Sequence, residues 1–369
     1  MPPIILRSPQ PLILFALPCL VTLTLSGCGN TDNTPSPQVQ LAPQILRDFA
    51  DQVVIPNHAL FATRAEALSQ AIGRFTQSPN ANTLGAAQQA WVAARAAWEQ
   101  TECFGFGPAD ALGYDGALDT WPVNETDLKA LLSSNQPLTP ESVRQMKETE
   151  KGFHAIEYFL FGTAKNRQPG DLTPRERQYL QLAGADFAQV AQNLAASWSQ
   201  GVEGKVAYRE VFTSAGQPAN TTYPTLQAGK AELIQGMLDS LDEVANEKIG
   251  KTFAERNPQL AESRFSFNTL TDMKSNLQGV QNVYLGRFPD GQTQGQGLSD
   301  WMAQTHPALD TEFKAQLQTA MDALAQIPSP FERAILDPKA ADAIKTAQSA
   351  INQARETLED KVKPLMVPS

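Results

Sequence analysis

Apolar residues recur at spacings of three and four along most of the chain, which is the period of amphipathic α-helices. Alternating runs of β-branched residues are nearly absent, so we expect few strands. The pattern therefore predicts an all-α protein. The helical segments that it predicts are 42–75, 80–104, 141–162, 173–200, 224–253, 269–288, 298–328 and 338–362.

Local signals mark several helix ends. Thr173, Pro174 and Glu176 match a capping box with proline in the first turn, so a helix should begin there. Gly162 is a natural stop for the helix before it. Pro56 should kink or split the first long helix, because proline lacks a backbone N–H and clashes with the preceding turn.

Residues 201–223 break the helical period and contain Gly, Pro, Asn and Thr. We therefore place a boundary here, between a first helical-bundle half, 44–205, and a second, 206–369. The strings GFHAIE, from Gly152, and GVQNVY, from Gly279, share a faint pattern. An internal duplication would explain it, but six-residue matches also arise by chance.

The first 27 residues have the order of a secretory signal peptide: a basic residue, an apolar stretch and small residues. LSGC, ending at Cys28, resembles the cleavage box of bacterial lipoproteins, in which the cysteine is lipidated. Residues 28–43 then form a polar linker. Gly29 after the cysteine favours the outer membrane, on its periplasmic side. The alternative is an ordinary signal peptide with a chance cysteine.

Charge and cysteine content exclude some functions. The formal net charge is −10, and an acidic protein repels phosphate backbones, so we expect no nucleic-acid partner. Beyond Cys28 the mature chain keeps only Cys103, which rules out a disulfide framework and a cysteine-rich zinc site.

The run KGFHAIEYFLFG, residues 151–162, contains one of only three histidines in the chain. His154 and Glu157 are three residues apart, so they share one face of a helix next to an apolar stripe. A buried carboxylate is costly unless it is paired or bound to a cation. Two interpretations stay open: a structural hydrogen-bonded pair, or a metal site with one nitrogen and one oxygen ligand.

The helix at 80–104 supplies further charged groups. Arg95, Glu99 and Glu102 follow spacings of four and three and share a face. Arg95 can balance the carboxylates, and Glu102 can add an acidic ligand at the mouth of the following Gly-rich loop, 105–124. The ordinary alternative is a set of solvated ion pairs.

These segments together resemble the imelysin family of bacterial envelope proteins. The family hallmark GxHxxE is present as Gly152, His154 and Glu157. Other family-like segments follow in the expected order over about residues 44–365. They are VVIPNHALF, WVAARAAWEQTECFGFGP, LDTWPVN with Asp119 and Trp121, and ESRFSFNTLTDMKSNLQGVQNVYLG with Glu262, Ser263, Ser266 and Tyr284.

The resemblance implies two helical halves related by duplication, with a shared cleft between them. It also implies a role in iron uptake at the cell envelope, together with other envelope components of an uptake system. In this interpretation a metal ion binds His154, Glu157 and Glu102. The family resemblance favours iron as that metal. Further ligand-binding residues are expected around it: Glu99, from its spacing on the Arg95 face, and Arg95, Asp119, Trp121, Glu262, Ser263, Ser266 and Tyr284, which lie in the family-like segments.

The family also carries a metallopeptidase label, and a metal-dependent peptidase using His154 and Glu157 is one alternative. One histidine and one glutamate supply two ligands, whereas a catalytic zinc site typically has three, so the residues argue only weakly for catalysis. A second alternative is a metal-free binding module for haem, a peptide or a polysaccharide.

Overall fold

The computed structural model describes residues 37–288 and 295–367. Within these residues the chain forms helices and loops without a β-strand, so the all-α prediction is confirmed. These described residues form one compact unit. The proposed signal peptide and Cys28 lie outside the described residues. None of the described helices combines the length and apolar character needed to cross a bilayer.

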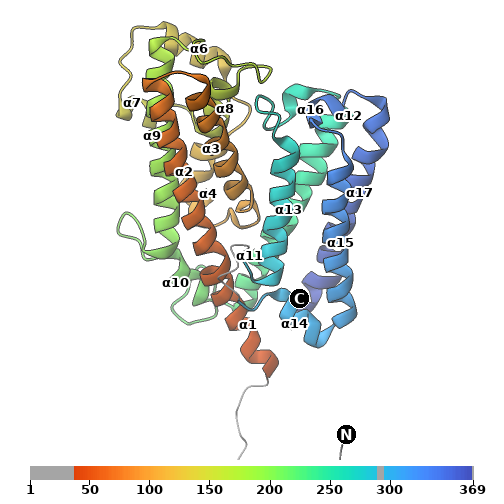
Figure 1. Ribbon diagram of the computed structural model, residues 1–369. Helices are drawn as coiled ribbons and strands as arrows, with labels where there is room; N and C mark the ends of the chain where they lie inside the picture. The colour runs from red at the N-terminus through yellow and green to blue at the C-terminus, as the bar shows by residue number, and fades with distance from the viewer. Residues whose placement is uncertain (1–36, 289–294, 368–369) are drawn as a thin grey trace, which may run out of the picture. The chain divides into compact units, whose positions relative to one another are not determined.

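Four helices of the first half pack together (Figure 1): α2 (Ile55–Gln77), α3 (Ala81–Glu99), α8 (Gly152–Phe161) and α9 (Pro174–Ser199). α2 contacts both α3 and α9, and α8 is also held between α3 and α9. Aromatic side chains fill the space between them, and Phe153 of α8 lies 4.5 Å from Phe187 of α9, centroid to centroid. The GxHxxE helix is therefore an inner element of this half.

Short helices connect α3 to α8 and shape the region around the candidate site. Among them, α5 contacts both α8 and α9, and it ends at the predicted site residue Asp119. The connecting elements are η2 (Glu102–Phe104), α4 (Pro108–Ala111), α5 (Tyr114–Asp119), α6 (Glu125–Ser133), α7 (Pro140–Arg144) and η3 (Glu148–Glu150).

Four helices of the second half also pack together: α11 (Leu226–Asp242), α13 (Thr269–Leu285), α15 (Pro307–Gln326) and α17 (Ala341–Thr357). α11 continues without a break into a π-helical segment, η4 (Glu243–Lys251). The remaining elements are α1 (Pro37–Asp48), η1 (Phe49–Val54), α10 (Tyr208–Thr213), α12 (Thr252–Ala254), η5 (Pro258–Leu260), α14 (Leu298–Thr305), α16 (Phe331–Ala334), η6 (Pro338–Ala340), η7 (Leu358–Val362) and α18 (Lys363–Met366).

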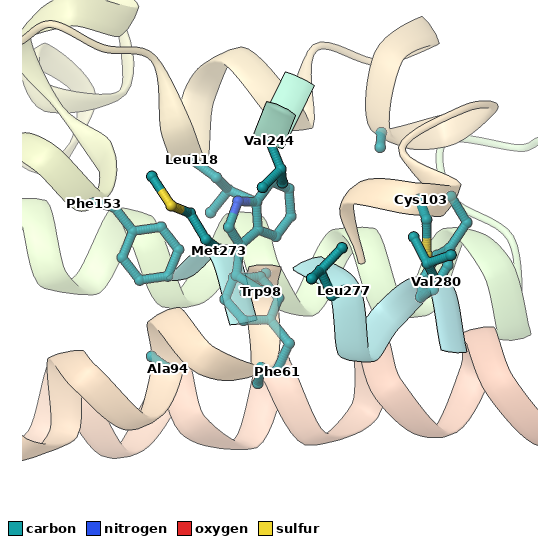
Figure 2. Packing of buried hydrophobic residues seen from close by; sticks show 14 of the residues in the cluster. Phe61, Ala94, Trp98, Cys103, Leu118, Phe153, Val244, Met273, Leu277 and Val280 are labelled. Atoms are coloured by element: carbon teal, nitrogen blue, oxygen red, sulfur yellow. The ribbon is translucent and has the colours of Figure 1, made fainter. Parts of the chain in front are cut away.

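Helix α13 packs directly against α3. Figure 2 shows Met273 and Leu277 of α13 beside Trp98 of α3, and all three side chains are buried. Gly279 allows this approach, since a Cβ atom there would lie 2.5 Å from the carbonyl oxygen of Gln100. The contact brings polar residues of α13 next to the end of α3. The division into halves at residue 205 and the internal duplication stay predictions.

Several local predictions can be compared with the structure. The capping box of Thr173 and Glu176 forms, and α8 ends at Gly162 with φ of +74°. At Pro56 the helix is not broken, because the preceding turn widens into the π-helix η1 and accommodates the missing N–H. One continuous helix over 141–162 is wrong: α7 ends at Arg144, a 3-10 turn follows in η3, and α8 begins at Gly152, whose φ of +78° does not occur in the interior of an α-helix.

Candidate functional site

Gly152 sets the start of α8 against the end of α5. A Cβ atom at this position would lie 2.5 Å from the carbonyl oxygen of Leu118, and the positive φ also favours glycine. The Nε1–H of Trp91 on α3 donates to the carbonyl of Phe153 at 3.0 Å and fixes the first turn. Because Leu118 precedes Asp119, this close packing brings the Asp119 carboxylate to His154.

His154 is buried between two carboxylates. Its Nδ1 lies 3.2 Å from Glu157 Oε2, and its Nε2 lies 3.1 Å from Asp119 Oδ1. The second contact is an ion pair that is not aligned as a hydrogen bond. Burial alone lowers the pKa of His154, but contact with the two carboxylates outweighs burial and raises the pKa to about 9. The imidazole is therefore held as a cation at neutral pH.

Glu157 joins α8 to the segment before α13. Its Oε1 accepts hydrogen bonds from the backbone N–H of Phe265 at 3.1 Å, from the N–H of Ser266 at 2.7 Å and from Ser266 Oγ at 2.7 Å. Phe267, next in the chain, has φ of +58°, which costs free energy for a side chain of this size. Glu157 thus holds a strained segment, 261–268, in place, and its other oxygen orients His154.

Arg95 lies at the centre of the site, with a fully buried guanidinium. It pairs with Glu99 one turn later on α3 and with Asp119, and it lies 2.8 Å from Glu262. A fourth carboxylate, Asp272 on α13, is 3.9 Å from Arg95 Nε. One guanidinium therefore organises acidic groups from four parts of the chain.

Lys248 is a second buried cation, which sequence reasoning missed. Its Nζ lies 3.1 Å from Glu99 Oε2 and 2.9 Å from Glu262 Oε2. Asn276 of α13 completes this group by donating to Glu99 Oε2 at 2.6 Å. A signal was available in the sequence: Lys248 falls four residues after Val244, inside the buried stripe of its helix.

The environment separates the pKa values of the carboxyl groups. Burial tends to raise all of them, but Arg95 and His154 outweigh it for Asp119, and Lys248 and Arg95 outweigh it for Glu262, so both pKa values are lowered. For Glu99 burial dominates and raises the pKa to about 7. Burial likewise raises the pKa of Asp272 well above its usual range. Ionised and proton-holding carboxyl groups thus coexist in one cluster.

Three sets of possible metal ligands occur among the described residues, each with atoms within 4.8 Å of one another. Only one contains a nitrogen: Asp119, His154 and Glu262. The other two are Glu99, Glu102 and Asp119, and Glu99, Glu262 and Asp272. The mixed set fits a transition metal by the chemistry of its donors, since imidazole and carboxylate ligands suit iron, zinc, manganese and copper.

Most of the predicted site residues come together here. The cluster contains Arg95, Glu99, Asp119, His154, Glu157, Glu262, Ser263 and Ser266. Trp121 is partly exposed at its edge, with its ring 6.5 Å from that of His154, and Glu102 is partly exposed on the Glu99 side. Tyr284 lies about 18 Å further along α13 than Asp272 and donates to Asp310 instead. Sequence reasoning missed Lys248, Asp272 and Asn276.

Glu157 was predicted as a metal ligand, and that role is untested. In this structure one of its oxygens accepts three hydrogen bonds and the other contacts His154. The shared cleft also stays a prediction. His154 is 1% exposed and Glu157 is fully buried, so the centre of the cluster is enclosed by side chains.

Comparisons with known proteins bear on the family and the fold of this chain. The family model described as Imelysin matches residues 54–358. Iron-regulated protein A of Synechococcus elongatus is 41% identical over 351 residues, which are 95% of this chain and 92% of that protein.

Two crystal structures share the fold. A protein of Parabacteroides distasonis, provisionally named an iron-regulated protein A precursor, superposes with a TM-score of 0.80 and 23% identity. An imelysin-like protein of Psychrobacter arcticum has a TM-score of 0.70 and 15% identity. Each comparison covers 89% of this chain and 96% of the other. With the family model matching most of its length, this chain belongs to the imelysin family.

Proposed function

We propose that this chain is a lipid-anchored envelope protein that binds iron, or an iron-bearing ligand, as part of iron uptake. The observation that carries the proposal is the convergence of Asp119, His154 and Glu262 from three separate elements onto one point. The name of the relative from Synechococcus elongatus, iron-regulated protein A, supports the choice of iron among the metals that such ligands accept.

The partners of the imidazole support this assignment. Metal-binding histidines usually donate the second ring N–H to a carboxylate, which fixes the ring and makes the other nitrogen a better ligand. Glu157 lies at hydrogen-bonding distance from Nδ1, and this leaves Nε2 directed at Asp119. In the proposal Asp119, His154 and Glu262 hold the ion and Glu157 orients the imidazole. The bound ion supplies positive charge that offsets the surrounding carboxylates.

Burial favours a small cation over a polypeptide as the species that reaches this cluster. The side chains of His154 and Glu262 are 1% and 2% exposed. A peptidase must bring a substrate carbonyl to the metal and keep a coordination position open for water. The observed packing therefore supports binding better than peptide hydrolysis, and better than direct contact with haem or a polysaccharide.

Calorimetry on the chelator-treated chain tests the metal site. Under anaerobic conditions we expect one equivalent of Fe²⁺ to bind at the His154 site. We expect His154→Ala and Asp119→Asn to weaken that binding strongly. His306→Ala is the matched control, since His306 lies far along the chain at the start of α15. Binding unaffected by either site substitution contradicts the proposal. Metal-dependent cleavage of a generic peptide substrate by the same samples would favour the peptidase instead.

Membrane attachment needs a separate test. Cys28 is the proposed lipidation site, and a chain with several acyl groups stays on a membrane because each buried methylene contributes about 0.8 kcal/mol. We expect the wild-type chain in the membrane fraction of a bacterial host and the Cys28→Ser variant in the soluble periplasmic fraction. Equal distribution of the two proteins would contradict the anchor, while leaving the metal site untouched.

A further inference from the structure

Asp272 is a fully buried carboxylate with one oxygen that lacks a hydrogen-bond partner. Its Oδ1 accepts from Asn268 Nδ2 at 2.7 Å, whereas no donor among the described residues is aligned with Oδ2. The nearest cationic group is Arg95 Nε, at 3.9 Å. Leaving an ionised carboxylate buried in this way costs several kcal/mol. A proton, which burial favours on this carboxyl group, removes that cost in the metal-free chain, and a bound cation would remove it in place of the proton.

A second buried oxygen lies beside the first without an aligned partner. Ser263 is fully buried, and its Oγ has no hydrogen bond of good alignment among the described residues. Its hydroxyl lies within hydrogen-bonding reach of Asp272 and lowers the pKa of that carboxyl group, which favours the ionised form that a cation would bind. Glu99 and Glu262 complete the arrangement, because each presents an oxygen within 4.8 Å of the other and of Asp272.

We propose that Glu99, Glu262 and Asp272, with the Ser263 hydroxyl, form a second cation site that takes a hard divalent ion. Its donors are all oxygen, unlike those of the His154 site, so the expected class is Mg²⁺, Ca²⁺ or Mn²⁺. The two sites share Glu262, whose carboxylate has two oxygens and can serve both. Arg95 and Lys248 then act as fixed counter-ions between neighbouring carboxylates.

The charge balance of the cluster supports two ions. Seven carboxylates interact here, namely Glu99, Glu102, Asp119, Glu157, Glu243, Glu262 and Asp272. Arg95 and Lys248 are the cations that stay charged, so with His154 neutral, as a metal ligand must be, and with all seven carboxyl groups ionised the formal excess is five negative charges. Burial raises the pKa of Glu99, Glu102, Glu243 and Asp272, so in the metal-free chain protons offset part of this excess, and a bound ion takes their place. One divalent ion leaves most of this excess, whereas two offset four of the five charges.

Titration with Mn²⁺ tests the second site without reference to iron. The chelator-treated full chain is titrated with Mn²⁺ alone, and bound ion is counted by electron paramagnetic resonance. We expect two equivalents for the wild type, one for Asp272→Asn and one for His154→Ala. Asp272→Asn keeps the oxygen that accepts from Asn268, so the fold should be preserved. The exposed carboxylate of Asp239 provides a matched control, and Asp239→Asn should retain both equivalents.

The outcomes separate the two proposals. The second site is overturned if the wild type binds one equivalent of Mn²⁺ and Asp272→Asn still binds it. It is also overturned if the wild type binds two equivalents and Asp272→Asn binds both. One equivalent that is lost in Asp272→Asn but kept in His154→Ala supports the second site and contradicts the first. If Asp272→Asn does not fold, Ser263→Ala decides. It should weaken the second equivalent by about 10-fold or more, and unchanged binding overturns the proposal.

Discussion

Glu157 on α8 and Ser266 before α13 form a double contact in which one carboxylate oxygen accepts from both the backbone N–H and the hydroxyl, each at 2.7 Å. These atoms are 109 residues apart in sequence and buried. The contact is a main attachment between the GxHxxE helix and the segment that carries Glu262. The glutamate of this motif therefore acts as an acceptor of hydrogen bonds as well as a negative charge.

Replacing Glu157 by alanine should destabilise the protein by about 3–5 kcal/mol, because it leaves buried donors unpaired and removes the partner of a buried imidazole. Unfolding in urea, followed by circular dichroism, measures the change. Glu141→Ala is the control: that side chain is 57% exposed and should matter by less than about 0.5 kcal/mol. Similar values for the two variants would contradict the role given to Glu157.

Gly152→Ala should also be destabilising, by roughly 2 kcal/mol or more, since alanine there combines a positive φ with a Cβ atom 2.5 Å from the Leu118 carbonyl oxygen. Gly73 gives an opposite control, because its Cβ position in α2 has no atom within 4 Å. Gly73→Ala should stabilise by about 0.5–1 kcal/mol. Thermal unfolding of both variants tests the pair, and a stable Gly152→Ala protein would refute the close packing of α5 and α8.

Lys248 should oppose metal binding while stabilising the metal-free chain. Its Nζ pairs with Glu99 and Glu262, so Lys248→Met leaves buried carboxylates unpaired at a cost of about 3–5 kcal/mol. The same change removes a positive charge from the cluster, and Fe²⁺ and Mn²⁺ should bind more tightly. Lys251, 55% exposed and three residues later, serves as the control in Lys251→Met. Weaker metal binding in Lys248→Met would show that the lysine supports the site instead.

Stability of the metal-free chain should depend on pH through His154. Its folded-state pKa, about 9, lies above the ordinary value of 6.5, so the folded chain holds this proton more tightly. The stabilisation is fully present below pH 6.5 and is lost as the pH rises through 9, with a size on the order of 3 kcal/mol. The difference in unfolding free energy between wild type and His154→Gln should shrink from pH 6.5 to 9.5.

The variant His58→Gln is the control for this pH experiment, because His58 is a buried histidine outside the cluster. Burial lowers the pKa of His58 to about 3, so this imidazole is neutral in the folded chain throughout the range tested. Its contribution should not change between pH 7.5 and 9.5, where the unfolded imidazole is neutral too. A pH-independent difference for His154→Gln as well would mean that the two carboxylates do not hold a proton on His154.

The sequence predicted the helical class and named most of the residues that lie together in the cluster, because both depend on patterns within one segment. Period, capping residues and the spacing of His154 and Glu157 are local properties. Asp272 and Asn276 were missed because a polar residue on a helix reads as solvent-exposed until the partner helix is known. Only the approach of α13 to α3, at Gly279, shows that these side chains face Glu99. Tyr284 shows the reverse error, since it shares a family-like segment with Glu262 but lies too far along its helix.

The π-helical geometry of η4 limits which insertions and deletions this protein can tolerate during evolution. A π-helical hydrogen bond spans one residue more than an α-helical one, i→i+5 in place of i→i+4, and an α-helix advances by about 100° per residue. Loss of one codon between Glu243 and Glu247 would restore ordinary winding and rotate the Lys248 ammonium away from its partners. Length at this spot, as much as residue identity, should therefore be under selection.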